Sequence, residues 1–292
     1  SGEKYLPDAL KNVTLSVGQG EFVVILGSSG CGKTTLLRQL KTSIAPHGRS
    51  SGKIEFKGRS LEEMDDRTSA RQIGFVQQDV DAQLVTDKVW HELAFGLESL
   101  GYKNAEIRIR VAEMASYFGI QDWFYKNVAE LSGGQKQRIS IGVALLMDPR
   151  LVIADEPVSA LDVTVQSQIL NLLLKLHAEK QMTILFISHD LNVVRGLCSR
   201  VMVIYKGVIV EEGLAEEIYE HPAHPYTKLL LEAAIGGDAM ELDAEAGKQS
   251  AEKCIFYERC PKRREACAHV PLSPEAVQLS RTHWARCIQI EA

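Results

Sequence analysis

The sequence predicts an α/β fold in which a parallel sheet is flanked by helices and carries a phosphate-binding turn. Short apolar runs, typical of buried strands, alternate with segments of helical periodicity. One run is followed directly by a glycine-rich loop and then by a helix, an arrangement that binds phosphate groups. A change of composition near residue 236 indicates that a smaller part follows the main domain.

The apolar runs that predict strands are residues 9–15, 21–26, 151–154, 183–187 and 201–205, with a hairpin-like segment at 52–58. Helices are expected at residues 34–40, 165–175 and 191–197. Between residues 87 and 127 the pattern is helical, with apolar positions at Val89, Leu93, Leu97, Leu100, Ile107, Val111, Met114 and Phe118. We therefore expect a helical subdomain at about residues 79–138 within a main domain of residues 1–235.

The loop after the strand at 21–26 reads Gly-Ser-Ser-Gly-Cys-Gly-Lys-Thr. Glycines let backbone N–H groups converge on phosphates, Lys33 can reach the β- and γ-phosphates, and the Thr34 hydroxyl can ligate Mg²⁺. The pattern predicts the core of a P-loop NTPase. Its candidate nucleotide-binding residues are Gly27, Ser28, Ser29, Gly30, Cys31, Gly32, Lys33, Thr34 and Thr35.

A pair of carboxylates follows the apolar run at 151–154. A central parallel strand would deliver Asp155 and Glu156 to its carboxyl edge, beside the phosphate loop. There Asp155 would hold Mg²⁺, and Glu156 could polarise the attacking water. Surface carboxylates without a catalytic role are the alternative for such a pair taken alone.

Four more short motifs accompany these two. Residues 131–135 read Leu-Ser-Gly-Gly-Gln, residues 159–162 read Ser-Ala-Leu-Asp, and Gln78 and His189 stand at characteristic distances from them. With these six motifs in order across roughly 190 residues, the chain resembles the ATP-binding cassette (ABC) family. Val158 and Gln77 depart from the usual pattern, but neither replaces a group that touches phosphate, metal or water.

The resemblance implies roles for the matching residues. Ser132, Gly133, Gly134 and Gln135 belong to the signature motif, Gln78 is the Q-loop glutamine that also reaches Mg²⁺, Asp162 ends the D-loop, and His189 senses the γ-phosphate. It also implies that two such ATPase subunits pair head to tail, as homodimer or heterodimer, with the signature of one completing the ATP site of the other. Small residues at a helix N-terminus suit that contact with phosphate.

Family members of the transporter branch work at the cytoplasmic face of the membrane, bound peripherally to transmembrane permease subunits and indirectly to an extracytoplasmic substrate-binding protein. Residues 78–96 resemble ATPases of energy-coupling-factor vitamin and metal (nickel or cobalt) importers. From residue 147 onward, including His221, Pro222, His224, Pro225 and Tyr226, the resemblance is to oligopeptide, dipeptide and nickel importers. An importer of di- or oligopeptides is the favoured interpretation, and an energy-coupling-factor importer of vitamins or metals is the alternative.

Composition fits this interpretation. The chain has 292 residues, of which 45% are hydrophobic, and a net charge of −5. Without a long basic tract it offers no obvious surface for nucleic acid, and no apolar run approaches the length of a membrane span. A soluble ABC ATPase of translation or DNA repair is the competing class, but such proteins usually carry two cassettes, a long coiled coil or basic arms.

The chain begins at Ser1, and residues 9–15 already resemble the second strand of an ABC domain. We therefore expect the first strand and its adenine-stacking aromatic to lie outside this sequence. Tyr5 is the local candidate for that stacking role, although a tyrosine near a strand more often packs in a core.

Residues 236–253 are acidic and poor in large apolar residues, which indicates a linker before a Cys-rich extension at 254–292. Cys254, Cys260, Cys267 and Cys287 are separated by five, six and nineteen residues, so no C-x₂₋₄-C pair of a zinc site is present. Zinc and unliganded or disulfide-bonded thiols remain alternatives. The resemblance to peptide-importer ATPases implies a [4Fe–4S] cluster on these four cysteines.

Overall fold

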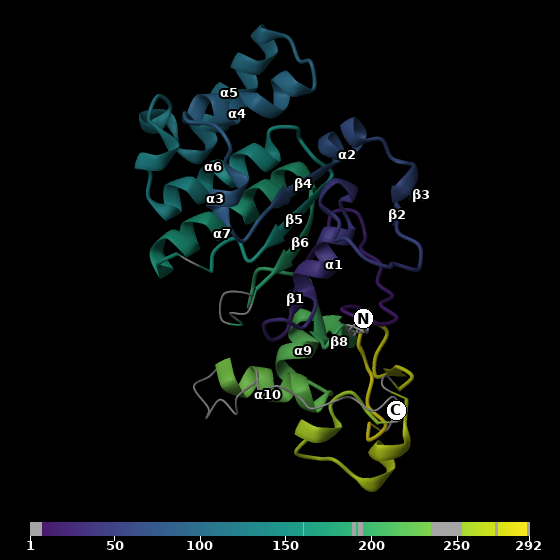
Figure 1. Ribbon diagram of the computed structural model, residues 1–292. Coiled ribbons are helices and arrows are strands. Elements are labelled where there is room, and N and C mark those ends of the chain that lie inside the picture. Colours follow the sequence, from purple (N-terminus) through teal and green to yellow (C-terminus); the bar gives the residue numbers. More distant parts are fainter. Residues whose placement is uncertain are drawn as a thin grey trace, which may run out of the picture. The chain divides into compact units, whose positions relative to one another are not determined.

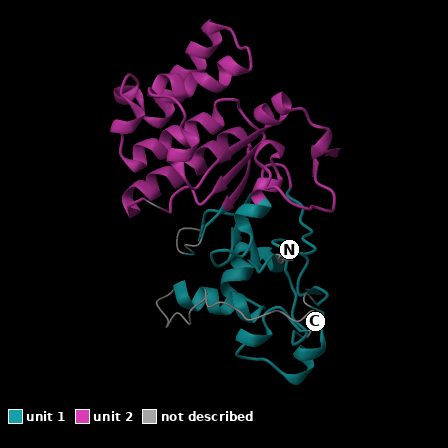
Figure 2. Ribbon diagram, viewed as in Figure 1, with its two compact units in different colours: residues 1–17, 21–36, 187–292 teal, residues 18–20, 37–186 magenta. Residues whose placement is uncertain are grey.

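The computed structural model of the protein describes residues 8–159, 161–188, 191, 195–234, 253–271 and 274–290. Figure 2 shows the chain divided into two compact units, one of residues 1–17, 21–36 and 187–292 (unit 1) and one of residues 18–20 and 37–186 (unit 2). The phosphate loop belongs to unit 1, whereas the carboxylates and the signature motif belong to unit 2.

Unit 1 is built on a sheet with the strand order β1-β7-β8-β10-β9. Its elements are β1 (Phe22–Leu26), the start of α1 (Lys33–Gln39), β7 (Arg200–Tyr205), β8 (Val208–Leu214), α9 (Ala215–Glu220), α10 (Pro225–Ala234), β9 (Val277–Gln278) and β10 (Trp284–Ala285), with short 3₁₀ turns η5 (Tyr257–Arg259) and η6 (Glu265–His269). The strands β1 and β7 are parallel, with Val23 opposite Arg200. All five residues of β1 are buried, as an apolar run at the centre of a parallel pair requires.

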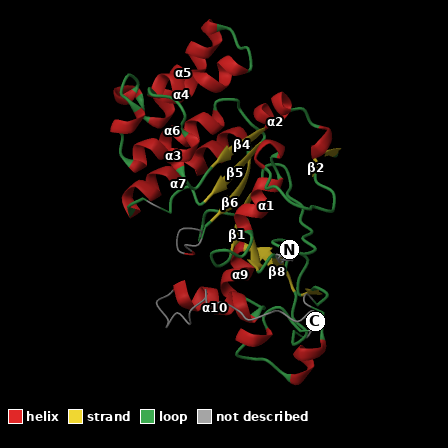
Figure 3. Ribbon diagram, viewed as in Figure 1, coloured by secondary structure: helices red, strands yellow, loops and turns green. Residues whose placement is uncertain are grey.

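Unit 2 contains the strands β4, β5 and β6, which are neighbours in that order. Its elements are η1 (Thr42–Ile44), the hairpin β2 (Glu55–Phe56) and β3 (Arg59–Ser60), η2 (Leu61–Glu63), α2 (Asp66–Gln72), β4 (Ile73–Val76), α3 (Val80–Gln83), α4 (Val89–Ser99), α5 (Asn104–Phe118), η3 (Gln121–Trp123), η4 (Val128–Glu130), α6 (Gly133–Leu145), β5 (Leu151–Asp155), α7 (Val163–Lys180) and β6 (Thr183–Ile187). The strands β4 and β5 are parallel, with Ile73 opposite Leu151. Figure 3 shows these strands bordered by the helices of the unit.

The helical subdomain of unit 2 is held by the apolar face that its sequence predicts. Val89, Leu93 and Leu97 on α4 are at most 1% exposed, and Ile107 and Phe118 on α5 are also buried. Figure 1 shows α4, α5 and α6 packed side by side. Burying such stripes between helices is the main source of their stability.

Two predictions about elements need correction. Residues 9–15 form no strand, because Asn12 adopts a φ of +48° that breaks the extended backbone. Lys11 still donates its amide to the carbonyl of Gly207 at 2.8 Å, which attaches the segment to the turn between β7 and β8. Helix α7 continues five residues beyond its predicted end at 175, until Gln181 takes the left-handed conformation with a φ of +51°.

Of the predicted helix at 191–197, residue 191 is helical, residues 195–197 form a turn, and residues 192–194 lie outside the described residues. The predicted linker at 236–253 lies outside them except for Lys253, and so does Tyr5. Among the described helices, none combines the length and the apolar character that crossing a bilayer demands.

Candidate functional site

The phosphate loop lies between β1 and α1 in unit 1, and close approach of other backbone requires its glycines. A Cβ on Gly27 would lie 2.4 Å from the carbonyl oxygen of Ile204, and one on Gly32 would lie 2.7 Å from that of Ala9. Gly30 and Gly32 also adopt positive φ values of +72° and +104°. Side chains at these positions would displace the loop, so the sequence pattern is a steric requirement as well as a chemical one.

Lys33 is buried, with 5% of its surface exposed, and its ammonium group forms hydrogen bonds within the loop. Its Nζ donates to the carbonyl oxygens of Gly27 and Ser28, each at 2.9 Å. A buried cation aimed at backbone oxygens of its own loop is positioned to exchange those partners for phosphate oxygens. The structure thus places Lys33 where the motif predicts, with Thr34 and Thr35 in the first turn of α1.

The loop also has a partner that the motif does not indicate. The backbone N–H of Ser28 donates to the Tyr226 hydroxyl at 2.8 Å, and Tyr226 lies 198 residues further along the chain. Tyr226 is fully buried, and burial raises its pKa to about 12, so the hydroxyl stays protonated at neutral pH. In the sequence, Tyr226 is notable only because residues 221–227 resemble the corresponding segment of peptide-importer ATPases. That resemblance does not predict a contact with the phosphate loop.

The carboxylate pair of unit 2 stands at the end of β5, as predicted. Asp155 is 2% exposed, while Glu156 adopts a φ of +46°, which turns the chain directly after the strand. Gln78, which follows β4, donates its side-chain amide to a carboxylate oxygen of Glu156 at 3.0 Å. Parallel pairing of β4 with β5 brings together these two residues, which are 78 positions apart.

The signature motif forms the N-terminus of α6. Ser132 caps the helix by accepting the amide of Gln135 at 3.3 Å, and the Gln135 side chain accepts the amide of Ser132 at 2.9 Å. This reciprocal arrangement is a capping box, which fixes the first turn. Ser132 and Gly133 are exposed, so the helix N-terminus and its partial positive charge are presented on the surface of unit 2.

Asp162 caps the next helix, α7, by accepting the amide of Val165 at 3.0 Å. Ser159 donates its hydroxyl to the carbonyl of Glu156 at 3.1 Å, which ties the D-loop to the carboxylate pair. Ala160 and His189 lie outside the described residues. The γ-phosphate-sensing role of His189 therefore stays a prediction.

The C-terminal extension gathers its cysteines around one cavity. Cys254, Cys260, Cys267 and Cys287 all line it, together with His224, Pro225, Phe256, Tyr257, Val270, Pro274, Ile288 and Gln289. All four are free thiols, and burial raises the pKa of Cys254, Cys260 and Cys287. Across the described ranges, however, no three His, Cys, Asp or Glu side chains are grouped closely enough to hold a metal ion as they stand.

The phosphate loop, the buried aspartate and the exposed capped helix define a nucleotide-binding ATPase. Comparison with known proteins places it more narrowly. Residues 10–159 match the ABC transporter family, and residues 210–267 match the oligopeptide/dipeptide transporter C-terminal region. The chain belongs to the ABC transporter ATP-binding family.

Individual relatives agree with this assignment. A Brucella ovis protein named for a proposed role as a peptide import ATP-binding protein is 34% identical over 294 residues, covering 96% of this chain and 91% of its own. A Bacillus cereus protein named as a proposed ABC transporter ATP-binding protein is 40% identical over 210 residues. The match covers 72% of this chain but only 38% of that relative's length.

Solved structures of cassettes are also similar. The cbiO1 protein of Clostridium perfringens, part of the ABC transporter complex cbiONQ, has a TM-score of 0.66 and 32% identity, covering 73% of this chain and 84% of its own. The ATP-binding cassette MJ0796, in a dimeric post-hydrolysis state bound to ADP and Pi, has a TM-score of 0.66 and 28% identity, covering 74% and 94% of the two chains. ATP and Mg²⁺ fit the nucleotide site of an ABC ATPase.

Proposed function

We propose that this chain hydrolyses ATP to power an importer of di- or oligopeptides. The observation that carries the proposal is the presence, in one chain, of an ABC cassette at residues 10–159 and the oligopeptide/dipeptide transporter C-terminal region at residues 210–267. The Brucella relative, which is similar over nearly its whole length, is named for a role in peptide import.

The side chains divide the work of hydrolysis. Lys33 and the loop amides would bind the phosphates of ATP. Thr34, Asp155 and Gln78 would hold Mg²⁺ through the hard oxygen donors that it prefers, and the ion would neutralise charge on those phosphates. Glu156 accepts a hydrogen bond from Gln78 at 3.0 Å, which orients its carboxylate for polarising the attacking water. The exposed Ser132 and Gly133 would contact the γ-phosphate bound by a second ATPase subunit, giving a head-to-tail dimer.

The partners follow from this mechanism. Transmembrane permease subunits would receive the closing and opening of the dimer, at the cytoplasmic face of the membrane, and an extracytoplasmic substrate-binding protein would supply cargo to them. Nucleic acid is not an expected partner.

A pull-down from membranes tests the proposal. The Glu156→Gln chain, held in the ATP-bound state with Mg²⁺, would be used as bait and its companions identified. Recovery of a peptide-type permease with a related ATPase supports the proposal. Recovery of a vitamin- or metal-type permease would assign the chain to the energy-coupling-factor alternative, and recovery of ribosomes or nucleic acid without membrane proteins would reject transport.

We further propose that the Cys-rich extension holds a [4Fe–4S] cluster. The donor set fits, because four free thiols on one cavity are the ligands that such a cluster takes. Since the thiols are not grouped for metal binding as they stand, the cysteines would draw together on loading. A bound cluster supplies a fixed cross-link between residues 254 and 287, and the chain's own part is to hold it and keep water from it.

Anaerobic purification with iron and sulfide analysis tests the cluster. About four iron and four sulfide per chain are expected for a [4Fe–4S] centre. Replacement of Cys260 and Cys267 by serine should abolish both signals. Colourless, iron-free protein with bound zinc would instead assign a zinc site.

A further inference from the structure

We infer that Tyr226 is a positioning residue of the phosphate loop, holding the Gly27–Ser28 peptide in place for nucleotide binding. The inference concerns ATP binding and does not depend on the transported cargo. It starts from the single hydrogen bond of 2.8 Å between the Ser28 amide and the Tyr226 hydroxyl.

The segment Gly27–Ser28 is held from two sides. The carbonyl oxygens of Gly27 and Ser28 accept from Lys33, while the Ser28 amide donates to Tyr226. When Lys33 turns to the phosphates of a bound nucleotide, its hold on these carbonyls weakens. Among the hydrogen bonds that the described side chains make with this peptide, the one with the tyrosine hydroxyl then remains, so it contributes more to the nucleotide-bound state than to the free one.

The tyrosine ring itself is rigidly placed. It lies 4.6 Å from the ring of Tyr205 on β7 and 5.5 Å from the ring of Phe256 in the C-terminal extension. Phe256 also contacts Tyr205 at 5.1 Å. All three side chains are at most 2% exposed, and such close aromatic packing leaves a buried ring little freedom to move its hydroxyl.

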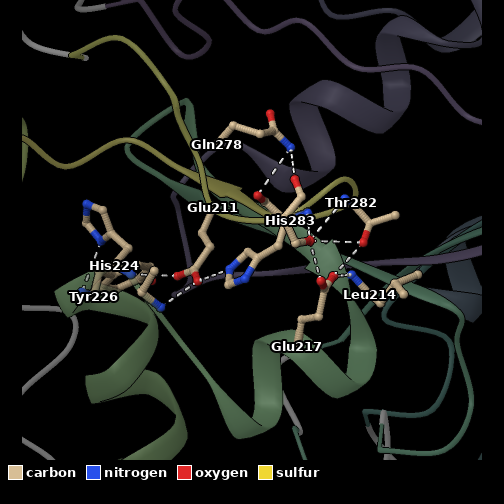
Figure 4. A network of polar contacts seen from close by, with 10 residues as sticks. Glu211, Leu214, Glu217, His224, Tyr226, Gln278, Thr282 and His283 are labelled. Carbon is tan, nitrogen blue, oxygen red and sulfur yellow. Dashed lines mark hydrogen bonds and ion pairs between the residues drawn. The ribbon is translucent and has the colours of Figure 1, made fainter. Parts of the chain in front are cut away.

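The backbone that carries Tyr226 is fixed as well (Figure 4). The Tyr226 amide donates to Nδ1 of His224 at 3.1 Å. The buried carboxylate of Glu211 accepts the amides of Ala223 and His224 at 2.7 and 2.9 Å and lies 2.8 Å from Nε2 of His283. The C-terminal extension therefore helps to fix Tyr226, through Phe256 and His283, and Tyr226 in turn contacts the phosphate loop.

The test compares two variants that each remove one hydroxyl. In Tyr226→Phe, we expect the Kd for Mg·ATP, measured by calorimetry on the full chain, to rise about 3- to 10-fold, which is the usual effect of losing one hydrogen bond. The KM for ATP should rise by a similar factor while kcat changes less than about twofold. Tyr219→Phe is the matched control, because the Tyr219 hydroxyl donates to the backbone carbonyl of Leu191 and not to the loop.

Two results would overturn the inference. One is an unchanged Kd in Tyr226→Phe, and the other is an equal loss of affinity in Tyr219→Phe. Should Tyr226→Phe not fold, hydrogen exchange of ¹⁵N-serine-labelled wild-type chain decides the matter. Slow exchange of the Ser28 amide is expected from its buried partner, and exchange at the rate of an unstructured amide would reject the role of Tyr226.

Discussion

Lys33 is the only side-chain cation among residues 27–34, and the loop buries it almost completely. Replacement by alanine removes the charge that would meet the β- and γ-phosphates in the proposed mechanism, so we expect Lys33→Ala to weaken Mg·ATP binding at least about 10-fold. Lys41→Ala is a suitable control, because Lys41 also donates to a backbone carbonyl at 2.8 Å, but to that of Ile73 and not to one of the loop. Equal nucleotide affinity in wild type and Lys33→Ala, measured by calorimetry, would refute the assignment.

Glu156 allows a sharper separation of binding from chemistry. In Glu156→Gln the side chain keeps its size and one oxygen for the Gln78 amide, but it loses the negative charge that polarises water in the proposed mechanism. We expect ATP hydrolysis to fall about 100-fold or more while nucleotide affinity is kept. Glu130→Gln, at an exposed carboxylate that accepts from Asn127, should hydrolyse ATP normally. Full turnover in Glu156→Gln would show that another group acts as the base.

At the scale of single residues, the sequence identifies candidate site residues that belong to motifs of fixed local spacing. The loop glycines, Lys33, Asp155 and Glu156 belong to short motifs whose geometry follows from a strand and a turn. Tyr226 could not be assigned in this way. Its contact with Ser28 depends on the pairing of β1 with β7, on that of β7 with β8 and on the docking of α10, none of which can be inferred from the residues around position 226.

Helix α6 illustrates how one element restricts another. A Cβ on Gly134 would lie 2.9 Å from Cγ1 of Val165 on α7, whereas a Cβ on Gly133 would meet nothing within 4 Å. Because Val165 is β-branched and stiff, it cannot easily move away from an alanine Cβ at position 134, and this steric overlap outweighs the gain in helix propensity. We therefore expect Gly134→Ala to lower the free energy of unfolding by about 1 kcal/mol. Gly133→Ala should be neutral or slightly stabilising.

A double-mutant cycle with Val165→Ala checks this explanation by chemical denaturation. Removing the valine methyl groups should relieve the overlap, so Gly134→Ala should cost less in the Val165→Ala background than in wild type. Additive effects of the two substitutions would mean that the contact between the helices is not what excludes a side chain at position 134.

The elements themselves were predicted with uneven success, for physical reasons. Strands β1, β5, β6 and β7 were recognisable because their central residues are buried on both faces and therefore apolar. Strands β9 and β10 have two residues each, too few for any periodicity, and they form only because β8 offers an edge to β10, with Trp284 opposite Glu212. The strand expected at residues 9–15 was wrong because one left-handed residue, Asn12, outweighed its apolar pattern.

At the scale of the whole molecule, the composition of the sequence and the contacts in the structure divide the chain differently. The change in composition at 236–253 separates a Cys-rich extension from the cassette, yet by its contacts the extension belongs to the same compact unit as the phosphate loop. The reason is that buried groups far apart in sequence contact one another: a carboxylate oxygen of Glu211 lies 2.8 Å from Nε2 of His283, and the ring of Tyr226 packs against that of Phe256. Sequence patterns report each segment's polarity but not its partner.

The proposed dimer places Ser132 against the γ-phosphate of a partner, and the N-cap position allows that placement to be tested without disturbing the helix. Aspartate and asparagine cap helices about as well as serine, so Ser132→Asp and Ser132→Asn should both keep α6 and the nucleotide affinity of the separate chain. The two differ in charge. In the Glu156→Gln background with Mg·ATP, light scattering after gel filtration should show a dimer for Ser132→Asn.

For Ser132→Asp we expect dimerisation to weaken at least about 10-fold, because a carboxylate would face a phosphate across the interface. High salt should narrow the difference between the two variants, since screening reduces repulsion between charges that water reaches. Equal dimerisation of both variants would show that Ser132 does not face the partner's nucleotide. Failure of both would show that the interface rejects the larger side chain and not its charge, which would leave the proposed phosphate contact without support.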